Sequence, residues 1–307
     1  MNWNGVFPAL TTKFFADGAI DYEAFLRNVD AQLEAGVDGI ILGGTLGEAS
    51  VLTTAEKQEL TERTIAHVAG KVPVVLNIAE GATHEAVKRA KEAEAIGAKG
   101  LMLLPPMRYV ADHREVVTFL RAVAESSSLP IMIYNNPVDY KIQVSLAMFE
   151  ELLEHENIQA VKESTRDISN VTRMLSRFGD RIKILCGVDT LAMESLVMGA
   201  HGWVAGLVCA FPRETVAIYR LVQAGRIQEA REIYRWFLPL LELDIVPKLV
   251  QNIKLAEQQV GLGTEHVRAP RLPLIGEERE RVLAIIDEGI RTRPAIPSLT
   301  ETAHALH

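Results

Sequence analysis

Two side chains at the ends of apolar runs could together act on a carbonyl compound. Lys162 ends the run IQAVK, where burial would lower the pKa of its ammonium group and leave a neutral amine able to attack a carbonyl carbon. Tyr134 ends the run LPIMIY, and its phenol could relay protons while an imine forms and dehydrates. The two residue types together therefore predict Schiff-base chemistry.

Each of these residues also has a simpler interpretation. Lys162 could pair with the adjacent Glu163 or extend its ammonium to solvent, and Tyr134 could pack as an ordinary strand tyrosine. A third segment, GGTLGEAS, has glycines that let a turn approach a ligand closely. The backbone N–H groups of this turn, with the Thr45 hydroxyl, could hold a carboxylate. A glycine-rich turn alone is weak evidence, so its weight comes from the two other segments.

The elements that must position these residues alternate between short apolar runs and amphipathic stretches, as in parallel strands joined by helices. We count eight strand candidates, at 6–11, 39–43, 72–77, 100–104, 131–134, 160–162, 182–186 and 202–205. Eight such units favour a closed (β/α)8 TIM barrel over an open sheet. The carboxyl ends of the strands form the active face of such a barrel, so Thr45, Tyr134 and Lys162 are expected to meet there.

The stretches between the strands have helix signals. The first begins at Asp21, a candidate N-cap, repeats apolar residues at helical spacing and stops at Gly36. After the eighth strand, four helical stretches follow with no strand between them, at 215–224, 227–240, 247–260 and 277–291. We therefore expect a barrel over 1–210, a helical extension over 211–292 and a flexible tail over 293–307.

Composition and charge exclude several classes of partner. The chain is 48% apolar and 23% charged, as in ordinary globular proteins, and its net charge is −8. The 32 basic residues are scattered among 40 acidic ones, so neither nucleic acid nor an anionic membrane is an expected partner. The sequence contains no apparent secretory signal or membrane span. With two cysteines, Cys186 and Cys209, it predicts packing roles in a reducing cytoplasm.

The three segments, in this order, resemble the dihydrodipicolinate synthase and N-acetylneuraminate lyase family of class I aldolase-like enzymes. The resemblance covers nearly the whole chain and includes GVFPALTT, GGTLGE, YNNP, VKEST, CGVDT and HGWVAG. It implies a barrel with a helical extension, assembled as a homotetramer, with no metal or other cofactor. It also implies that Lys162 forms an imine with a small 2-oxo acid, that Tyr134 moves protons, and that the turn holds the substrate carboxylate. The expected catalytic residues are Lys162, Tyr134 and Thr45, and the expected substrate-binding residues are Gly44, Leu46, Asp139, Gly187 and Val204.

Departures from the family pattern bear on the substrate. Dihydrodipicolinate synthases have two threonines in the turn, whereas here Leu46 follows Thr45. They also have an arginine two residues after the proline of the YNxP motif, where Asp139 stands and would repel the carboxylate of the aldehyde substrate. Their second tyrosine, lent by a neighbouring subunit, aligns near Met107, with Tyr109 as a displaced substitute. These departures predict that the chain does not catalyse dihydrodipicolinate synthesis.

The remaining pattern looks most like the branch of 1-pyrroline-4-hydroxy-2-carboxylate deaminases, on the segments PPMRY, YNNPVDY and VKESTRD. In that reaction Lys162 would displace the ring nitrogen, the 4-hydroxyl would leave, and hydrolysis would release ammonia and 2-oxoglutarate semialdehyde. The alternatives are a 2-keto-3-deoxy sugar acid dehydratase, a 4-hydroxy-2-oxoglutarate aldolase and, from another class, a non-catalytic binding barrel. A metal-dependent aldolase is disfavoured because the eight histidines show neither H-x-H nor H-E-x-x-H spacing.

Overall fold

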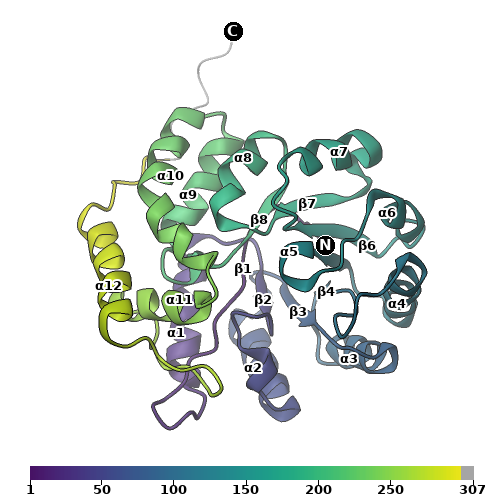
Figure 1. Ribbon diagram of the computed structural model, residues 1–307, viewed down its shortest axis with the longest axis horizontal. Coiled ribbons are helices and arrows are strands. Elements are labelled where there is room, and N and C mark those ends of the chain that lie inside the picture. The colour runs from purple at the N-terminus through teal and green to yellow at the C-terminus, as the bar shows by residue number, and fades with distance from the viewer. Residues whose placement is uncertain (299–307) are drawn as a thin grey trace.

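The computed structural model describes residues 1–298, and its centre is a parallel eight-stranded sheet rolled into a barrel (Figure 1). The strands are β1 (Gly5–Pro8), β2 (Ile40–Leu42), β3 (Val74–Ile78), β4 (Gly100–Leu103), β5 (Ile131–Asn135), β6 (Ile158–Glu163), β7 (Lys183–Cys186) and β8 (Gly202–Ala205). They are hydrogen-bonded in the order β1-β8-β7-β6-β5-β4-β3-β2. The predicted (β/α)8 TIM barrel is therefore confirmed, with each predicted strand overlapping an observed one.

The barrel closes differently on the two sides of β1. On one side β1 pairs with β8 along its whole length, from Gly5 opposite Gly202 to Pro8 opposite Ala205. On the other side β1 and β2 are joined by an isolated bridge between Ala9 and Ile41. The first strand is shorter than predicted because the chain leaves the sheet after this bridge.

The strands are buried on both faces, which explains their continuous apolar sequences. β2 reads IIL and is buried throughout, as is the IMI run of β5. Helices α1 (Tyr22–Ala35), α2 (Thr54–Val68), α3 (Thr83–Ala95), α4 (His113–Ser126), α6 (Leu146–Leu152), α7 (Ser169–Phe178) and α8 (Ala192–Val197) surround the strands (Figure 1). The core thus lies partly inside the barrel and partly between the barrel and these helices.

Helix α1 shows how local sequence fixes these elements. Its N-cap is Asp21, whose carboxylate accepts a hydrogen bond from the backbone N–H of Ala24 at 2.9 Å. Its C-cap is Gly36, with a φ of 84° that suits glycine. Both predicted caps are confirmed. No helix in residues 1–298 is long and apolar enough to span a membrane.

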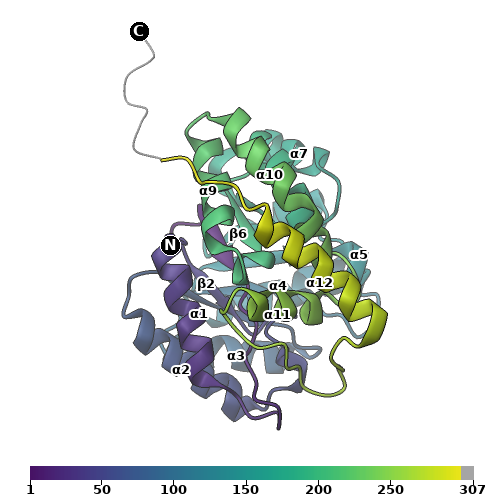
Figure 2. The same ribbon diagram turned by 90° about the vertical axis from the view of Figure 1, so that its left-hand side faces the viewer.

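Helices α9 (Pro212–Gln223), α10 (Ile227–Leu241), α11 (Leu249–Gln259) and α12 (Gly276–Arg291) follow β8 without another strand. Figure 2 faces the side on which α10, α11 and α12 cover the barrel. The helices are where the sequence predicts them, whereas the division of the chain into barrel, extension and tail stays a prediction. At the start of the predicted tail, the Arg293 guanidinium pairs with Glu214 at 2.5 Å. Residues 299–307 of that tail lie outside the described residues.

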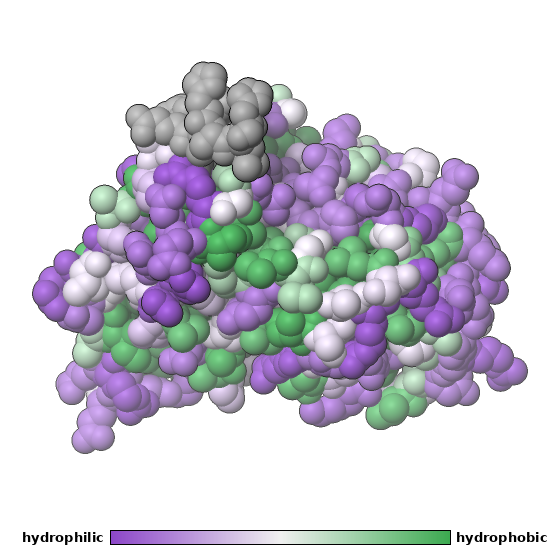
Figure 3. Space-filling model, turned by 90° about the horizontal axis from the view of Figure 1, so that it is seen from above, coloured by the Kyte–Doolittle hydropathy of each residue, from purple (hydrophilic) through white to green (hydrophobic). Residues whose placement is uncertain are grey.

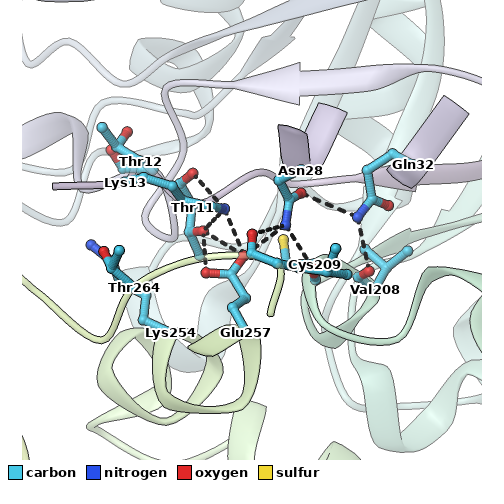
Figure 4. Close-up of polar contacts among 12 residues, drawn as sticks. Thr11, Thr12, Lys13, Asn28, Gln32, Val208, Cys209, Lys254, Glu257 and Thr264 are labelled. Atoms are coloured by element: carbon cyan, nitrogen blue, oxygen red, sulfur yellow. Dashed lines mark hydrogen bonds and ion pairs between the residues drawn. The ribbon is translucent and has the colours of Figure 1, made fainter. Parts of the chain in front are cut away.

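A buried polar cluster joins the extension to the barrel (Figure 4). At its centre is Glu257 of α11, whose carboxylate accepts hydrogen bonds from the Thr11 hydroxyl at 2.8 Å and the Lys13 ammonium at 2.7 Å. The Asn28 side chain of α1 donates to the same carboxylate at 3.4 Å. Lys13 and Glu257 are 0% exposed, so each charge depends on these partners in place of water. The cluster fixes the chain that leaves β1 against α11.

Candidate active site

Lys162 lies in the wall of a cavity at the carboxyl ends of the strands. Its side chain projects from β6 and is buried, and burial lowers the pKa of its ammonium below the ordinary 10.5. The next residue, Glu163, accepts hydrogen bonds from the Thr165 N–H and the Asn170 side chain, both at 2.8 Å. The Glu163 carboxylate is therefore satisfied by these groups, and the Lys162 amine faces the cavity.

Tyr134 lies beside Lys162 because β5 and β6 are neighbours and these two residues are in register. The Lys162 Nζ is 4.1 Å from the centroid of the Tyr134 ring. Burial raises the pKa of Tyr134 to about 12, although a hydrogen bond from the Asn136 side chain to its hydroxyl, at 3.0 Å, partly opposes this. The phenol thus keeps its proton at neutral pH and is available as a donor.

The GGTLGE turn follows β2 and is held by hydrogen bonds from β3 and from the segment that follows β1. The Asn77 side chain donates to the Gly43 carbonyl at 3.0 Å, and the Thr12 hydroxyl donates to the Gly47 carbonyl at 2.7 Å. Gly43 has a φ of 73°, a backbone conformation that favours glycine. Within this turn, the Thr45 hydroxyl is 3.0 Å from the hydroxyl of Tyr140.

The turn is also tied to the extension through Glu48. This residue is 0% exposed and pairs with Lys254 of α11 at 2.7 Å. Its carboxylate accepts a further hydrogen bond from the Arg268 N–H at 3.1 Å, and Arg271 lies 4.0 Å away. Burial lowers the pKa of Lys254 to about 8 even though Glu48 favours its charged form. The extension therefore helps to set the position of the proposed carboxylate-binding turn.

Gly187 follows β7 and lies against Lys162. A Cβ atom at this position would meet Ser164 Oγ at 2.2 Å and Lys162 Cε at 2.6 Å. Real Cβ contacts are not this short, so glycine gives the lysine side chain its space. The absence of a side chain at Gly187 thus leaves space for the Lys162 side chain.

Two aspartates lie close enough to Lys162 to affect its charge. Asp189 accepts hydrogen bonds from Trp203 Nε1 and the Leu207 N–H, both at 2.9 Å. Asp244 comes from the 3-10 turn Glu242–Asp244 of the extension, and its carboxyl reaches over Gly206. Burial raises the pKa of Asp244, and the nearby charge of Asp189 raises it further. Asp244 is thereby biased toward its neutral form beside Lys162.

Asp139 lies at the mouth of the cavity in the short helix α5 (Pro137–Tyr140). Its carboxylate accepts a hydrogen bond from the Asn136 side chain at 2.8 Å and lies 3.9 Å from the Arg166 guanidinium. Arg166 also lines the cavity. This neighbour weakens the repulsion of a substrate carboxylate that the sequence predicts from Asp139 alone.

The cavity has a volume of about 830 Å³, and all eight site residues predicted from sequence line it. They are Lys162, Tyr134, Thr45, Gly44, Leu46, Asp139, Gly187 and Val204. Their roles stay predictions. Tyr109 is 55% exposed, whereas Met107 and Arg108 are among the lining residues.

Sequence reasoning missed Tyr140, Arg166 and Asp244, which also line the cavity. The segment YNNPVDY held a signal for Tyr140, because Asn-Pro commonly starts a helical turn that returns the chain toward the strand end. Asp244 had no such signal. Together the lining groups offer a buried amine, two phenols and a glycine-rich turn, a set suited to carbonyl addition and proton transfer.

Comparison with known proteins gives consistent matches. The model of the Dihydrodipicolinate synthetase family matches residues 2–289. The 4-hydroxy-tetrahydrodipicolinate synthase of Exiguobacterium sibiricum is 31% identical, covering 89% of this chain and 92% of its own. The enzyme of the same name from Pelobacter propionicus is 30% identical, covering 92% of this chain and 98% of its own. Among solved structures, the 4-hydroxy-tetrahydrodipicolinate synthase of Methylacidiphilum fumariolicum SolV superposes with a TM-score of 0.89 at 29% identity, covering 94% of this chain and 98% of its own.

Proposed function

The chain belongs to the dihydrodipicolinate synthetase family of class I lyases, and we propose that its Lys162 forms a Schiff base with a small 2-oxo acid or its cyclic imine. The observation that carries this proposal is the buried Lys162 amine, 4.1 Å from the ring centre of Tyr134 in the barrel cavity. A lysine whose pKa is lowered by burial has a larger neutral fraction at a given pH, and the neutral amine is the nucleophile.

We further propose that the substrate is 1-pyrroline-4-hydroxy-2-carboxylate. Lys162 would add to C2 and expel the ring nitrogen, which stays on C5 as an amine. Loss of a proton from C3 and of the hydroxyl from C4 would release water. The C5 amine would then tautomerise to an imine, and hydrolysis of both imines would free Lys162, ammonia and 2-oxoglutarate semialdehyde. The net reaction consumes one water, because two are added and one is lost.

Several groups in the cavity support this sequence of steps. Tyr134 is protonated and lies next to the amine, so it could donate to a departing oxygen or nitrogen. The N–H groups of the turn at Gly44 and Leu46 would bind the substrate carboxylate beside the Thr45 hydroxyl. Asp139, Asn136 and Arg166 make the mouth polar, which suits a hydroxylated substrate.

The test is reductive trapping. The protein is incubated with 1-pyrroline-4-hydroxy-2-carboxylate or with pyruvate, treated with borohydride, digested and analysed by mass spectrometry. We expect the adduct on Lys162, with no adduct in Lys162→Ala. Lys13 and Lys254 are internal controls, since both are buried but paired with carboxylates at 2.7 Å. An adduct at another lysine would contradict the mechanism, and capture of pyruvate without release of ammonia from the cyclic imine would contradict the substrate.

A second candidate is the reaction for which the relatives are named, 4-hydroxy-tetrahydrodipicolinate synthesis. The position of Arg166, 3.9 Å from Asp139, favours it, because this guanidinium could bind a second carboxylate. Asp139 and Leu46 oppose it, since the first is acidic and the second removes a hydroxyl from the turn. We expect negligible condensation of pyruvate with aspartate semialdehyde in a coupled assay, and robust condensation would instead establish the synthase reaction.

We also propose that the chain assembles as a homotetramer. Apolar residues form a band between polar margins on the face in Figure 3. Tyr109 and Val110 of the loop after β4 are exposed, and such residues are often covered in an assembly. Light scattering coupled to size exclusion should give four times the mass of 33.9 kDa, and a monomer mass at micromolar concentration would contradict the proposal.

A further inference from the structure

Tyr140 lies next to the proposed catalytic groups of the same chain. Its hydroxyl is 3.0 Å from that of Thr45, and its ring meets the Tyr134 ring edge to face with centroids 5.6 Å apart. Both tyrosines and Lys162 line the same cavity. We infer that Tyr140 is a proton-relay residue, which exchanges protons with the cavity through the Thr45 hydroxyl and does so within its own subunit. This inference rests on the proposed Schiff-base function.

The local backbone holds Tyr140 in this position. Asn136 caps α5 by accepting a hydrogen bond from the Asp139 N–H at 3.2 Å, and Pro137 occupies the first helical position. The Tyr140 N–H donates to the Asn136 carbonyl at 3.1 Å. Lys141, with a φ of 63°, then ends the helix. A single turn directly after β5 therefore returns the tyrosine over the strand end that carries Tyr134.

The Thr45–Tyr140 contact suits proton transfer in both directions. Either hydroxyl can donate to the other, since each carries one proton and lone pairs. When the carbinolamine loses its oxygen, the C2–O bond breaks, the C2=N bond forms, and the oxygen leaves as water with a proton from Thr45. Tyr140 returns a proton to Thr45, and the phenolate regains one from solvent at the cavity mouth. Hydrolysis of the imine runs the same transfers in reverse.

Tyr140 is less buried than Lys162. Lys162 is 9% exposed, whereas Tyr140 is only half-buried and so has a side open to water. Thr45 is exposed, so the Thr45–Tyr140 pair lies where protons can enter and leave the cavity. Tyr109, the substitute expected from sequence, is 55% exposed and belongs to a loop that reaches the cavity through Met107 and Arg108. Neither of those two side chains is a phenol.

The first experiment compares single tyrosine variants of the full-length protein in single-turnover kinetics. We expect Tyr140→Phe to lower the rate of imine formation by about 10²–10⁴-fold, with little change in substrate binding. Tyr22→Phe is the matched control, because Tyr22 lies in α1 and its ring contacts Arg63. Thr45→Val added to Tyr140→Phe should cost little more, since both changes interrupt one relay. A Tyr140→Phe rate within twofold of the wild type, or a Tyr109→Phe loss as large as that expected for Tyr140→Phe, would overturn the inference.

A solvent isotope effect separates a proton relay from a structural role. The wild-type rate in D₂O should fall by a factor that disappears in Tyr140→Phe, whereas a purely structural role would leave this factor unchanged. Borohydride trapping of pyruvate on Lys162 is measured in parallel in both proteins. If Tyr140→Phe turns over slowly but is still trapped on Lys162, the Schiff-base function is supported. If the wild type is not trapped, the proposed Schiff-base function itself is refuted.

The second experiment asks whether Tyr140 serves its own subunit. Lys162→Ala and Tyr140→Phe chains, with different affinity tags, are co-expressed, and mixed assemblies are isolated by both tags in turn. If Tyr140 acts within its chain, no subunit of the mixture has both groups and activity stays at the level of the separate variants. Recovery of activity in the mixed assemblies would show that Tyr140 serves a neighbouring subunit and would overturn the inference.

Discussion

Replacing Lys254 with methionine should both destabilise the fold and weaken substrate binding, although Lys254 belongs to the extension. In the wild type its ammonium pairs with Glu48 at 2.7 Å, and both groups are 0% exposed. Lys254→Met keeps a long apolar side chain but leaves the Glu48 carboxylate buried without its main counter-charge. Because Glu48 is the last residue of the GGTLGE turn, its relaxation would move Thr45. We measure unfolding in urea and kcat/KM on the same preparations.

The expected size of the effect follows from what remains around Glu48. Breaking a buried ion pair by removing one partner costs about 3–5 kcal/mol. Here the Arg268 N–H still donates at 3.1 Å and Arg271 stays near, at 4.0 Å, so the lower end, about 3 kcal/mol, is expected. A turn displaced by a fraction of an ångström should lower kcat/KM by about 10- to 100-fold.

Two further variants control for this interpretation. Lys248→Met removes a similar side chain from an exposed pair with Glu278, and should cost less than about 1 kcal/mol. Glu48→Gln added to Lys254→Met removes the stranded charge and should recover part of the lost stability. If the free energy of unfolding of Lys254→Met lies within about 1 kcal/mol of that of the wild type, the buried Glu48 carboxylate does not need Lys254 as its counter-charge, and this reasoning is refuted.

Three other outcomes are expected at the site itself. Tyr134→Phe should lower kcat by about 10²–10⁴-fold while costing about 1 kcal/mol of stability, and a nearly silent change in single-turnover kinetics would assign Tyr134 to packing. Gly187→Ala should abolish trapping on Lys162 at a cost of about 1–3 kcal/mol in thermal unfolding, because the new methyl group needs space held by Lys162 and Ser164; normal trapping would contradict this. Trapping of pyruvate should speed up with rising pH and level off below pH 10.5, because burial lowers the pKa of Lys162 and the neutral amine is the reacting form. A rate still rising at pH 10.5 would mean that the amine is solvated.

The barrel could be predicted because its strands are short and buried on both faces, so that they read as apolar runs between helices with clear caps. Asp21 and Gly36 show this for α1, where each cap interaction is local in sequence. The sequence predicts that the first strand ends at residue 11, because VFPALT continues as an apolar run. In the structure Thr11 has left the sheet and donates to Glu257, 246 residues away, a partner that no local pattern reveals.

In the candidate site, too, local sequence predicts some residues, whereas others depend on contacts between distant segments. Lys162 and Tyr134 were brought together by one rule, that polar residues at the carboxyl ends of barrel strands face a common cavity. Asp244 could not be found in this way, because it follows a helix of the extension and its direction depends on how that helix packs. The link between Lys254 and Glu48 spans 206 residues, and each is an unremarkable charged residue in its own segment.

The seam between β1 and β2 gives the barrel a preferred place to open. The Ala9–Ile41 bridge there replaces the longer ladder that joins β1 to β8, so local fluctuations should separate these two strands most readily. The turn that bears Thr45 begins just beyond β2, so a separation of β1 from β2 would also move this turn. A ligand held by that turn would favour the state in which β1 and β2 are paired. Binding in the cavity would therefore also stabilise the barrel against opening at this seam.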